Sequence, residues 1–142
     1  MPEAPERMSL EQIQDRFDQS PAISTLGLKV LSLDYAASEL KVEMPFRPTL
    51  ERRPGTGQFH GGPIAFFIDT VGDYAVGMML GAPVPTINIR IDYLKPAVGG
   101  SLTAVARVRV AGRRVSVVDI EVLDDEASLI AIGRGTYASV AG

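Results

Sequence analysis

The spacing of hydrophobic residues divides the 142-residue chain into elements of two kinds. Ser9 and Gln12 have the layout of a helix-capping box, and the apolar residues after them predict a short helix to about Ser20. From Gly61 to about Leu80, apolar residues recur three and four positions apart, which predicts the dominant helix. Alternation with a period of two predicts strands, which we expect over residues 26–33, 38–46, 87–93, 102–110, 115–123 and 128–138.

This order of elements predicts an α+β domain. An antiparallel sheet must cover one apolar face, and the central helix is the element long enough to do so. We therefore expect a curled antiparallel β-sheet wrapped around a long central helix, with the other face of the sheet solvated or paired with a second subunit. A single domain over residues 9–142 would follow a flexible tail over residues 1–8, which is polar and holds two prolines.

The composition and the net charge of the chain argue against several classes of function. The chain has no cysteine and one histidine, which excludes disulfides, thiolate nucleophiles and the usual two-histidine metal sites. We therefore expect no metal and no cofactor. The net charge of −3 gives no basic surplus for binding nucleic acid. The longest apolar stretch contains Asp69 and Asp73, which argues against a membrane span, and we expect a soluble, cytoplasmic protein.

His60, Gly61 and Gly62 stand where the central helix begins. The first N–H groups of a helix have no partner within it, glycine admits a ligand close to the backbone, and the helix dipole favours negative charge there. Such a turn suits the carbonyl oxygen of a thioester, which becomes negative in the transition state. On the residues alone, an ordinary glycine-rich helix start with a packed histidine is the more economical explanation.

Asp69 lies among apolar residues of the predicted central helix, where burying a carboxylate is costly unless it is paired with another group or hydrated. It is a candidate nucleophile or general base. Alternatively, it is a buried carboxylate satisfied by backbone groups or water, or one that lies at a subunit boundary. Asp73 lies one turn later on the same face, where two like charges raise one pKa. Gly61 and Asp69 are eight positions apart, about 12 Å along a helix. A reacting atom must approach both within about 3 Å, so a site that uses both residues must combine two subunits.

The run from His60 to Thr70 resembles the signature of the PaaI-type hot-dog thioesterases, in which an HGG turn is followed, nine residues after the histidine, by a catalytic Asp or Glu. The similarity continues through Asp92-Tyr93-Leu94-Lys95-Pro96 and Gly112-Arg113-Arg114, and it covers roughly residues 26–138. It implies a hot-dog fold and the hydrolysis of an acyl-CoA, with an aryl or a short or medium acyl chain, to the free acid and CoA. It also implies a homodimer, or a dimer of dimers.

The resemblance assigns roles to individual residues. The Gly61 N–H would polarise the thioester carbonyl, and His60 would shape the turn that presents it. Asp69 of the partner subunit would attack the thioester or activate water. Thr86 would orient the water or the carboxylate, although a plain threonine at the start of a strand explains this position equally well.

One departure from the family pattern favours an alternative function. Relatives usually carry Asn or Gln six residues before the histidine, where this chain has Pro54, and Gln58 is the candidate substitute. The departure leaves open a non-catalytic acyl-CoA-binding or scaffold protein with the same fold. An acyl-thioester hydratase is disfavoured, because its longer His-Phe-Pro and Asp-x-x-x-x-His signatures are not in the sequence.

Substrate binding would add contacts around the thioester and at the phosphates of CoA. We expect Gly62 and Asp73 to line the substrate site. Arginine suits phosphate because its fork makes two parallel hydrogen bonds. The candidates for phosphate, each of which is alternatively a solvated surface charge, are Arg113 and Arg114, followed by Arg90, Lys95 and Arg134.

Overall fold

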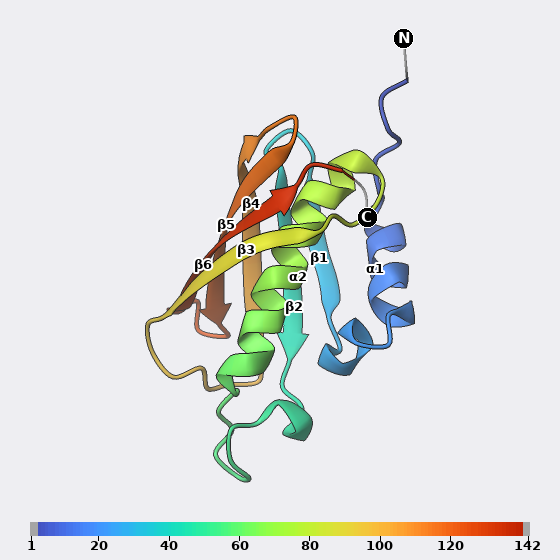
Figure 1. Ribbon diagram of the computed structural model, residues 1–142. Coiled ribbons are helices and arrows are strands. Elements are labelled where there is room, and N and C mark those ends of the chain that lie inside the picture. Colours follow the sequence, from blue (N-terminus) through green and yellow to red (C-terminus); the bar gives the residue numbers. More distant parts are fainter. Residues whose placement is uncertain (1–2, 141–142) are drawn as a thin grey trace.

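Residues 3–140, which the computed structural model describes, form two α-helices and six β-strands in the order predicted from the sequence (Figure 1). The helices are α1 (Leu10–Gln19) and α2 (Gly61–Leu80), and two short 3-10 turns are η1 (Ile23–Leu26) and η2 (Pro48–Leu50). The strands are β1 (Lys29–Asp34), β2 (Glu39–Pro45), β3 (Thr86–Tyr93), β4 (Ser101–Ala111), β5 (Val115–Asp124) and β6 (Leu129–Ala138).

All six strands belong to one antiparallel sheet with the order β1-β2-β4-β5-β6-β3. After α2 the chain crosses to the far edge of the sheet, where β3 pairs with β6 and places Arg90 opposite Arg134. The sheet curls around α2, with β1 and β2 on one side of the helix and β3 and β6 on the other (Figure 1). The predicted curled sheet around a long central helix is therefore confirmed.

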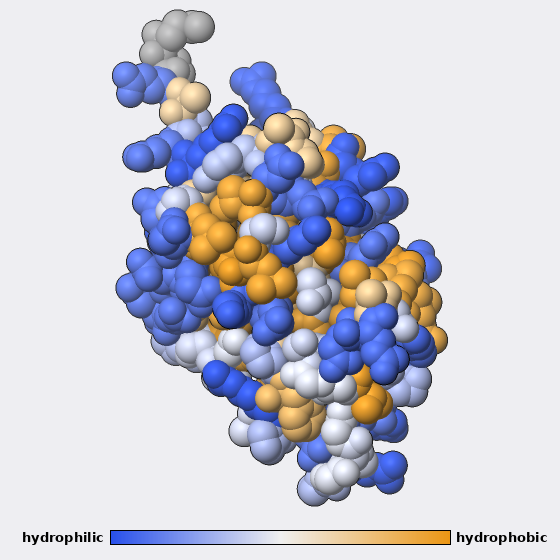
Figure 2. All heavy atoms as spheres, turned by 180° about the vertical axis from the view of Figure 1, so that it is seen from behind, coloured by the Kyte–Doolittle hydropathy of each residue, from blue (hydrophilic) through white to orange (hydrophobic). Residues whose placement is uncertain are grey.

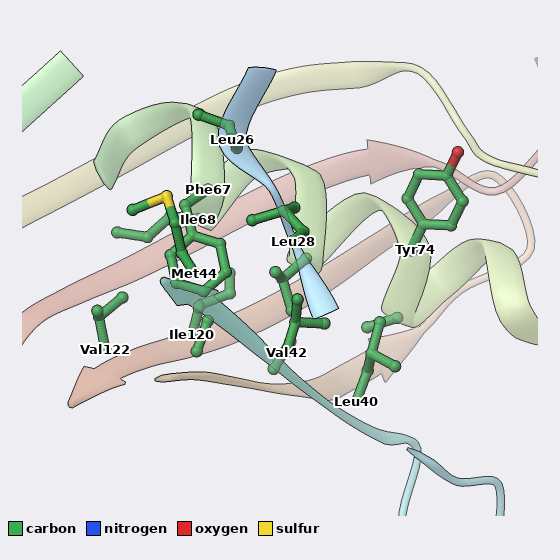
Figure 3. Close-up of a cluster of buried hydrophobic side chains, with 14 of the residues drawn as sticks. Leu26, Leu28, Leu40, Val42, Met44, Phe67, Ile68, Tyr74, Ile120 and Val122 are labelled. Carbon is green, nitrogen blue, oxygen red and sulfur yellow. The ribbon is translucent and has the colours of Figure 1, made fainter. Parts of the chain in front are cut away.

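The core lies between α2 and the inner face of the sheet. Leu40, Val42 and Met44 alternate along β2 and are fully buried, and Phe67 and Ile68 of α2 lie beside Met44 (Figure 3). Burying a side chain of this size contributes about 1.5–3 kcal/mol, so the hydrophobic pattern locates these elements well. By length and composition α2 could cross a membrane, but 61% of that stretch is buried inside the domain. Its apolar character therefore serves the core.

The N-terminal helix is capped as the sequence predicts. The Ser9 hydroxyl accepts from the Gln12 N–H at 3.1 Å, and the Gln12 side chain accepts from the Ser9 N–H at 2.8 Å. Phe17, on the buried face of α1, points into the core. Met8, within the segment expected to be a tail, is buried, and its N–H donates to the Met78 carbonyl at 2.9 Å. The chain therefore contacts the core from residue 8 onward.

One predicted strand starts later than the hydrophobic alternation indicates. Leu26 ends η1, Gly27 adopts a left-handed conformation with φ of +65°, and β1 begins only at Lys29. Leu26 and Leu28 are both buried, as the alternation predicts. The prediction of a strand from residue 26 was nevertheless wrong, because the left-handed glycine between the two leucines interrupts the extended backbone.

A glycine of α2 allows the sheet to approach the helix closely. A Cβ at Gly72 would overlap the hydroxyl of Tyr137 and would lie 3.1 Å from the side chain of Ile120. Tyr137 and Ile120 have no exposed surface, so neither can move aside at low cost. The small side chain at this position is therefore explained by packing within one subunit.

The outer face of the sheet carries charged side chains as well as hydrophobic ones. Asp119 accepts two hydrogen bonds from Arg134, at 2.6 and 3.0 Å, and Glu39 accepts one from Arg107 at 2.7 Å. Seen from behind, the molecule shows its hydrophobic side chains in separate areas with hydrophilic ones between them (Figure 2). Ion pairs therefore join neighbouring strands on this face.

The two edges of the sheet differ. The Gln14 side chain of α1 closes the start of β1, because it donates to the Leu28 carbonyl at 2.9 Å and accepts from the Val30 N–H at 2.8 Å. Within residues 3–140, no side chain or loop makes such a hydrogen bond to the outer edge of β3. That strand also exposes 58% of Ile87 and 52% of Tyr93. An open edge with exposed apolar side chains is a site for pairing with another chain.

Candidate active site

The start of α2 leaves one backbone donor without a partner. His60 is the N-cap residue, and its Nδ1 accepts from the Gly62 N–H at 2.9 Å. The His60 N–H donates to the Leu50 carbonyl at 2.8 Å. Between these two, the Gly61 N–H has no acceptor among the described residues. A helix start with one unused N–H can stabilise a negative oxygen, whereas the N–H of Gly62 is already bonded.

An open pocket of about 360 Å³ lies beside Gly61. Tyr93, the last residue of β3, forms part of its wall, and the Tyr93 hydroxyl donates to the Gly61 carbonyl at 2.7 Å. Gln58 and Lys95, both expected at the site, line the same pocket, and so does Arg52. Because β3 holds the first turn of α2 through Tyr93, the position of the Gly61 backbone is fixed from outside the helix.

Asp69 lies two turns further along α2 and is half-buried. The Thr86 hydroxyl, at the start of β3, donates to Asp69 Oδ1 at 2.8 Å. The buried Tyr137 hydroxyl donates to the backbone carbonyl of Asp69 at 3.2 Å. Burial raises the pKa of the Tyr137 hydroxyl well above its usual value, and the nearby charge of Asp69 adds to this effect. Both hydroxyls therefore act as donors that hold Asp69, one at the carboxylate and one at the backbone.

Asp73 shares the helix face of Asp69 and is tied to the connection that follows α2. Its Oδ1 accepts from the Val84 N–H at 2.7 Å. Burial raises the pKa of the Asp73 carboxyl from 3.8 to about 7, the hydrogen bond from Val84 opposes this, and the charge of Asp69 adds to the rise. The sequence predicted a raised pKa from two like charges, and in the structure burial is the larger cause. Asp73 anchors the segment that carries Thr86.

Two half-sites therefore lie along α2. We call Gly61 with His60 and Tyr93 the Gly61 half-site, and Asp69 with Thr86 the Asp69 half-site. They are eight residues apart on one continuous helix, which is about 12 Å. The opposite ends of β3 touch them, because Tyr93 bonds to the first and Thr86 to the second. One subunit does not bring the two half-sites together.

Most of the predicted phosphate-binding cations lie away from this pocket within the subunit. Arg90 and Arg134 line the outer face of the sheet, and each is within 4 Å of a carboxylate. Arg113 and Arg114 lie in the hairpin between β4 and β5, at the opposite end of the molecule from the start of α2 (Figure 1). Among the predicted cations, Lys95 lines the pocket beside Gly61.

The sequence indicated no role at the site for Arg52 or Tyr137. The contact between Tyr137 and Asp69 joins residues 68 positions apart, and the contact between Tyr93 and Gly61 joins residues 32 positions apart. Hydrophobic periodicity does not reveal which strands become neighbours of a helix. For Tyr93 a signal was present, since it belongs to the second segment that resembles the thioesterase family.

Comparison with known proteins identifies the same family over most of the chain. Residues 56–131 match the family described as the thioesterase superfamily. "Putative esterase VNG_1336C" of Halobacterium salinarum is 35% identical over 136 residues, which cover 88% of this chain and 88% of that protein. The acyl-coenzyme A thioesterase PaaI of Escherichia coli is 28% identical over 127 residues, covering 89% of this chain and 87% of that protein.

Solved structures agree with these sequence matches. The structure of E. coli PaaI has a TM-score of 0.78 at 26% identity, covering 94% of this chain and 98% of that chain. The thioesterase HI1161 of Haemophilus influenzae has a TM-score of 0.82 at 25% identity, covering 95% of this chain and 92% of that chain. Since the family match also spans more than half of the sequence, the chain belongs to the thioesterase superfamily, and it is a thioester hydrolase with the PaaI-type hot-dog fold.

Proposed function

We propose that the protein hydrolyses acyl-CoA to the free acid and CoA at a site shared by two subunits, where Gly61 of one subunit and Asp69 of the other act on one thioester. The observation that carries this proposal is the Gly61 N–H, which has no acceptor in the described chain although the N–H groups on both sides of it are bonded. Gly61 also lines an open pocket. A related protein named acyl-coenzyme A thioesterase supports CoA as the thiol.

In this reaction the Gly61 N–H, at the positive end of the α2 dipole, donates to the thioester carbonyl as its oxygen becomes negative. The Asp69 carboxylate, held by the Thr86 hydroxyl, takes a proton from water while the water oxygen bonds to the carbonyl carbon, or it bonds to that carbon itself. The C–S bond then breaks with its electron pair on sulfur. The CoA sulfur takes up a proton. In the first route this step leaves the free acid, whereas in the second route the acyl group stays on Asp69 as an anhydride, and water then adds to it, breaks the bond between the acyl carbon and the Asp69 oxygen, and releases the acid.

The open edge of β3 supports the assembly that this reaction needs. Two copies related by a twofold axis pair identical edges in an antiparallel way, so the start of one β3 lies beside the end of the other. Thr86 at the start bonds to Asp69, and Tyr93 at the end bonds to Gly61. Pairing through β3 would therefore bring Asp69 of the partner subunit towards the Gly61 half-site.

The first test measures thiol release from a panel of aryl, short-chain and medium-chain acyl-CoAs. Wild-type protein should turn over at least one member, and Asp69→Asn should remove most of this activity. The asparagine keeps an acceptor for the Thr86 hydroxyl, so loss of activity reports on the charge rather than on local packing. Binding of CoA without turnover of any panel member would refute hydrolysis and favour the non-catalytic alternative.

A second variant removes the proposed oxyanion donor alone. Gly61 is the first residue of α2, where proline is favoured because the missing N–H has no helical partner. His60 already has the extended backbone, with φ of −68° and ψ of 146°, that a residue before proline prefers. Gly61→Pro should fold and lower kcat by about 10²–10³-fold. Gly61→Ala keeps the N–H, and its Cβ would make an ordinary 3.5 Å contact with Tyr93, so it is the matched control.

Mixing the two inactive variants tests the shared site directly. A dimer of one Asp69→Asn subunit and one Gly61→Pro subunit contains one site with both an intact Gly61 and an intact Asp69. After subunit exchange at equal concentrations, about half of the dimers are mixed and about a quarter of wild-type activity should return. If both residues acted within one subunit, no mixture would recover activity.

A further inference from the structure

The pocket beside Gly61 is lined by two positively charged side chains and by no carboxylate of the described chain. The two cations are Arg52 and Lys95. Neither cation takes part in an ion pair within residues 3–140. By contrast, Arg107 and Arg134 on the outer face of the sheet are bonded to carboxylates. Within the described residues, the wall of the pocket therefore carries two cations that form no ion pair.

Both cations stand on segments that are tied to the start of α2. The Arg52 N–H donates to the Gln58 carbonyl at 2.8 Å, and the Leu50 carbonyl, two residues earlier, accepts from the His60 N–H at 2.8 Å. Lys95 follows Tyr93 by two residues, and the Tyr93 hydroxyl bonds to the Gly61 carbonyl. The backbones that carry the two cations are thus held relative to the Gly61 half-site from both sides of the pocket.

We propose that Arg52 and Lys95 bind phosphate groups of CoA, so that the subunit that supplies the Gly61 N–H also holds the charged end of the substrate. This inference rests on the proposed function. The guanidinium of Arg52 can make two parallel hydrogen bonds to one phosphate, while Lys95 contributes a mobile point charge. In the same subunit Arg113 and Arg114, the first candidates from the sequence, lie at the opposite end of the molecule (Figure 1).

If these contacts form, the enzyme should prefer thioesters whose thiol carries phosphate, and this preference should appear as a lower KM. Thioesters of CoA and of pantetheine present the same carbonyl to Gly61, but pantetheine carries no phosphate. Contacts that are equally strong in the ground state and the transition state change KM and leave kcat unchanged. The wild-type protein should therefore have a higher KM for the acyl-pantetheine than for the acyl-CoA, with a similar kcat, and added salt should raise KM for the acyl-CoA alone.

The test compares Arg52→Gln, Lys95→Gln and the double variant on one acyl group carried by CoA, by 3′-dephospho-CoA and by pantetheine. For the double variant we expect KM for the acyl-CoA to rise about five- to tenfold, the size of two partly exposed charge contacts. KM for the acyl-pantetheine should not change. The dephospho-CoA series shows whether the 3′-phosphate or the pyrophosphate is bound. Arg53→Gln is the matched control, because Arg53 is the exposed neighbour of Arg52 and does not line the pocket.

Two results would overturn the inference. An equal rise in KM for acyl-CoA and acyl-pantetheine would mean that the two side chains shape the pocket rather than bind phosphate. An unchanged KM for acyl-CoA in the double variant would place the phosphates elsewhere. If the wild-type protein turned over no thioester, the proposed function would fail separately. Calorimetry with CoA itself would then still decide the inference, through weaker CoA binding by the double variant than by Arg53→Gln.

Discussion

Asp73 links the stability of the domain to pH, and the substitution Asp73→Asn isolates that link. The Asp73 carboxyl is largely buried, its Oδ1 accepts from the Val84 N–H at 2.7 Å, and its pKa is raised from 3.8 to about 7. Asparagine has nearly the same shape and keeps an oxygen that can accept from Val84. The substitution therefore removes the ionisation and leaves the hydrogen bond in place.

The raised pKa of Asp73 determines how the free energy of unfolding depends on pH, in both sign and size. Between pH 4 and 7 the folded protein keeps a proton on Asp73 that the unfolded chain has released, so the free energy of unfolding of the wild type falls as pH rises through this range. One pKa unit corresponds to about 1.4 kcal/mol, so the complete loss for a pKa of about 7 is about 4 kcal/mol. The asparagine variant does not suffer this loss.

The measurement is urea unfolding followed by circular dichroism, at one protein concentration and at several pH values from 4 to 8. The two proteins should have similar stability at pH 4, and the variant should become more stable by up to about 4 kcal/mol at pH 8. Asp15→Asn, at an exposed position of α1, should stay within about 0.5 kcal/mol of wild type throughout. A stability difference that does not change with pH, or a variant less stable at pH 8, would refute the assignment of a costly buried charge to Asp73.

Three further outcomes test other contacts. Thr86→Val removes the hydroxyl that donates to the Asp69 carboxylate. If Asp69 acts as proposed, kcat should fall about tenfold, whereas Thr86→Ser should stay near wild type in the same thiol-release assay. Gly72→Ala places a Cβ on the hydroxyl of a fully buried tyrosine and should destabilise by about 1–3 kcal/mol in urea, while Gly61→Ala should be nearly neutral. Ile87→Glu adds a charge to the open strand edge and should weaken dimers in sedimentation experiments, and Val110→Glu, which changes an equally exposed residue of β4, should not.

The elements of this fold could be predicted from the sequence because each buries one face in a regular pattern. The α2 stripe and the alternation in β2, β5, β6 and the first half of β4 correspond to side chains that the structure buries. In the second half of β4, past a register shift between Val108 and Val110, the alternation continues but Val110 is exposed. The pattern failed before β1, where a left-handed Gly27 separates two buried leucines and the alternation continues without a strand. Burial with a period of two is therefore necessary for a half-buried strand but does not prove one.

For the candidate site, too, features set by neighbouring residues could be predicted, whereas contacts between distant residues could not. The start of α2 at His60 and Gly61 follows from local residues, and the distance between Gly61 and Asp69 depends only on the rise of a helix. The sequence predicted both features, but not the hydrogen bond from the Gly62 N–H to His60 Nδ1. The contacts of Tyr93 with Gly61 and of Thr86 with Asp69 depend on β3 crossing to the far edge of the sheet. No local pattern specifies that crossing.

The position of β3 connects assembly with chemistry. A single strand bonds to the Gly61 half-site through Tyr93 and to the Asp69 half-site through Thr86, and the same strand is the open edge of the sheet. Pairing of two β3 strands would therefore position both halves of the active site in one step. A slip of one residue in the pairing would turn every side chain of β3 to the other face of the sheet. The register of the two β3 strands must therefore be fixed for the Gly61 half-site of one subunit to face the Asp69 half-site of the other. In this arrangement the residues that hold the dimer together also set the geometry of hydrolysis, so a subunit that folds correctly on its own would still be inactive.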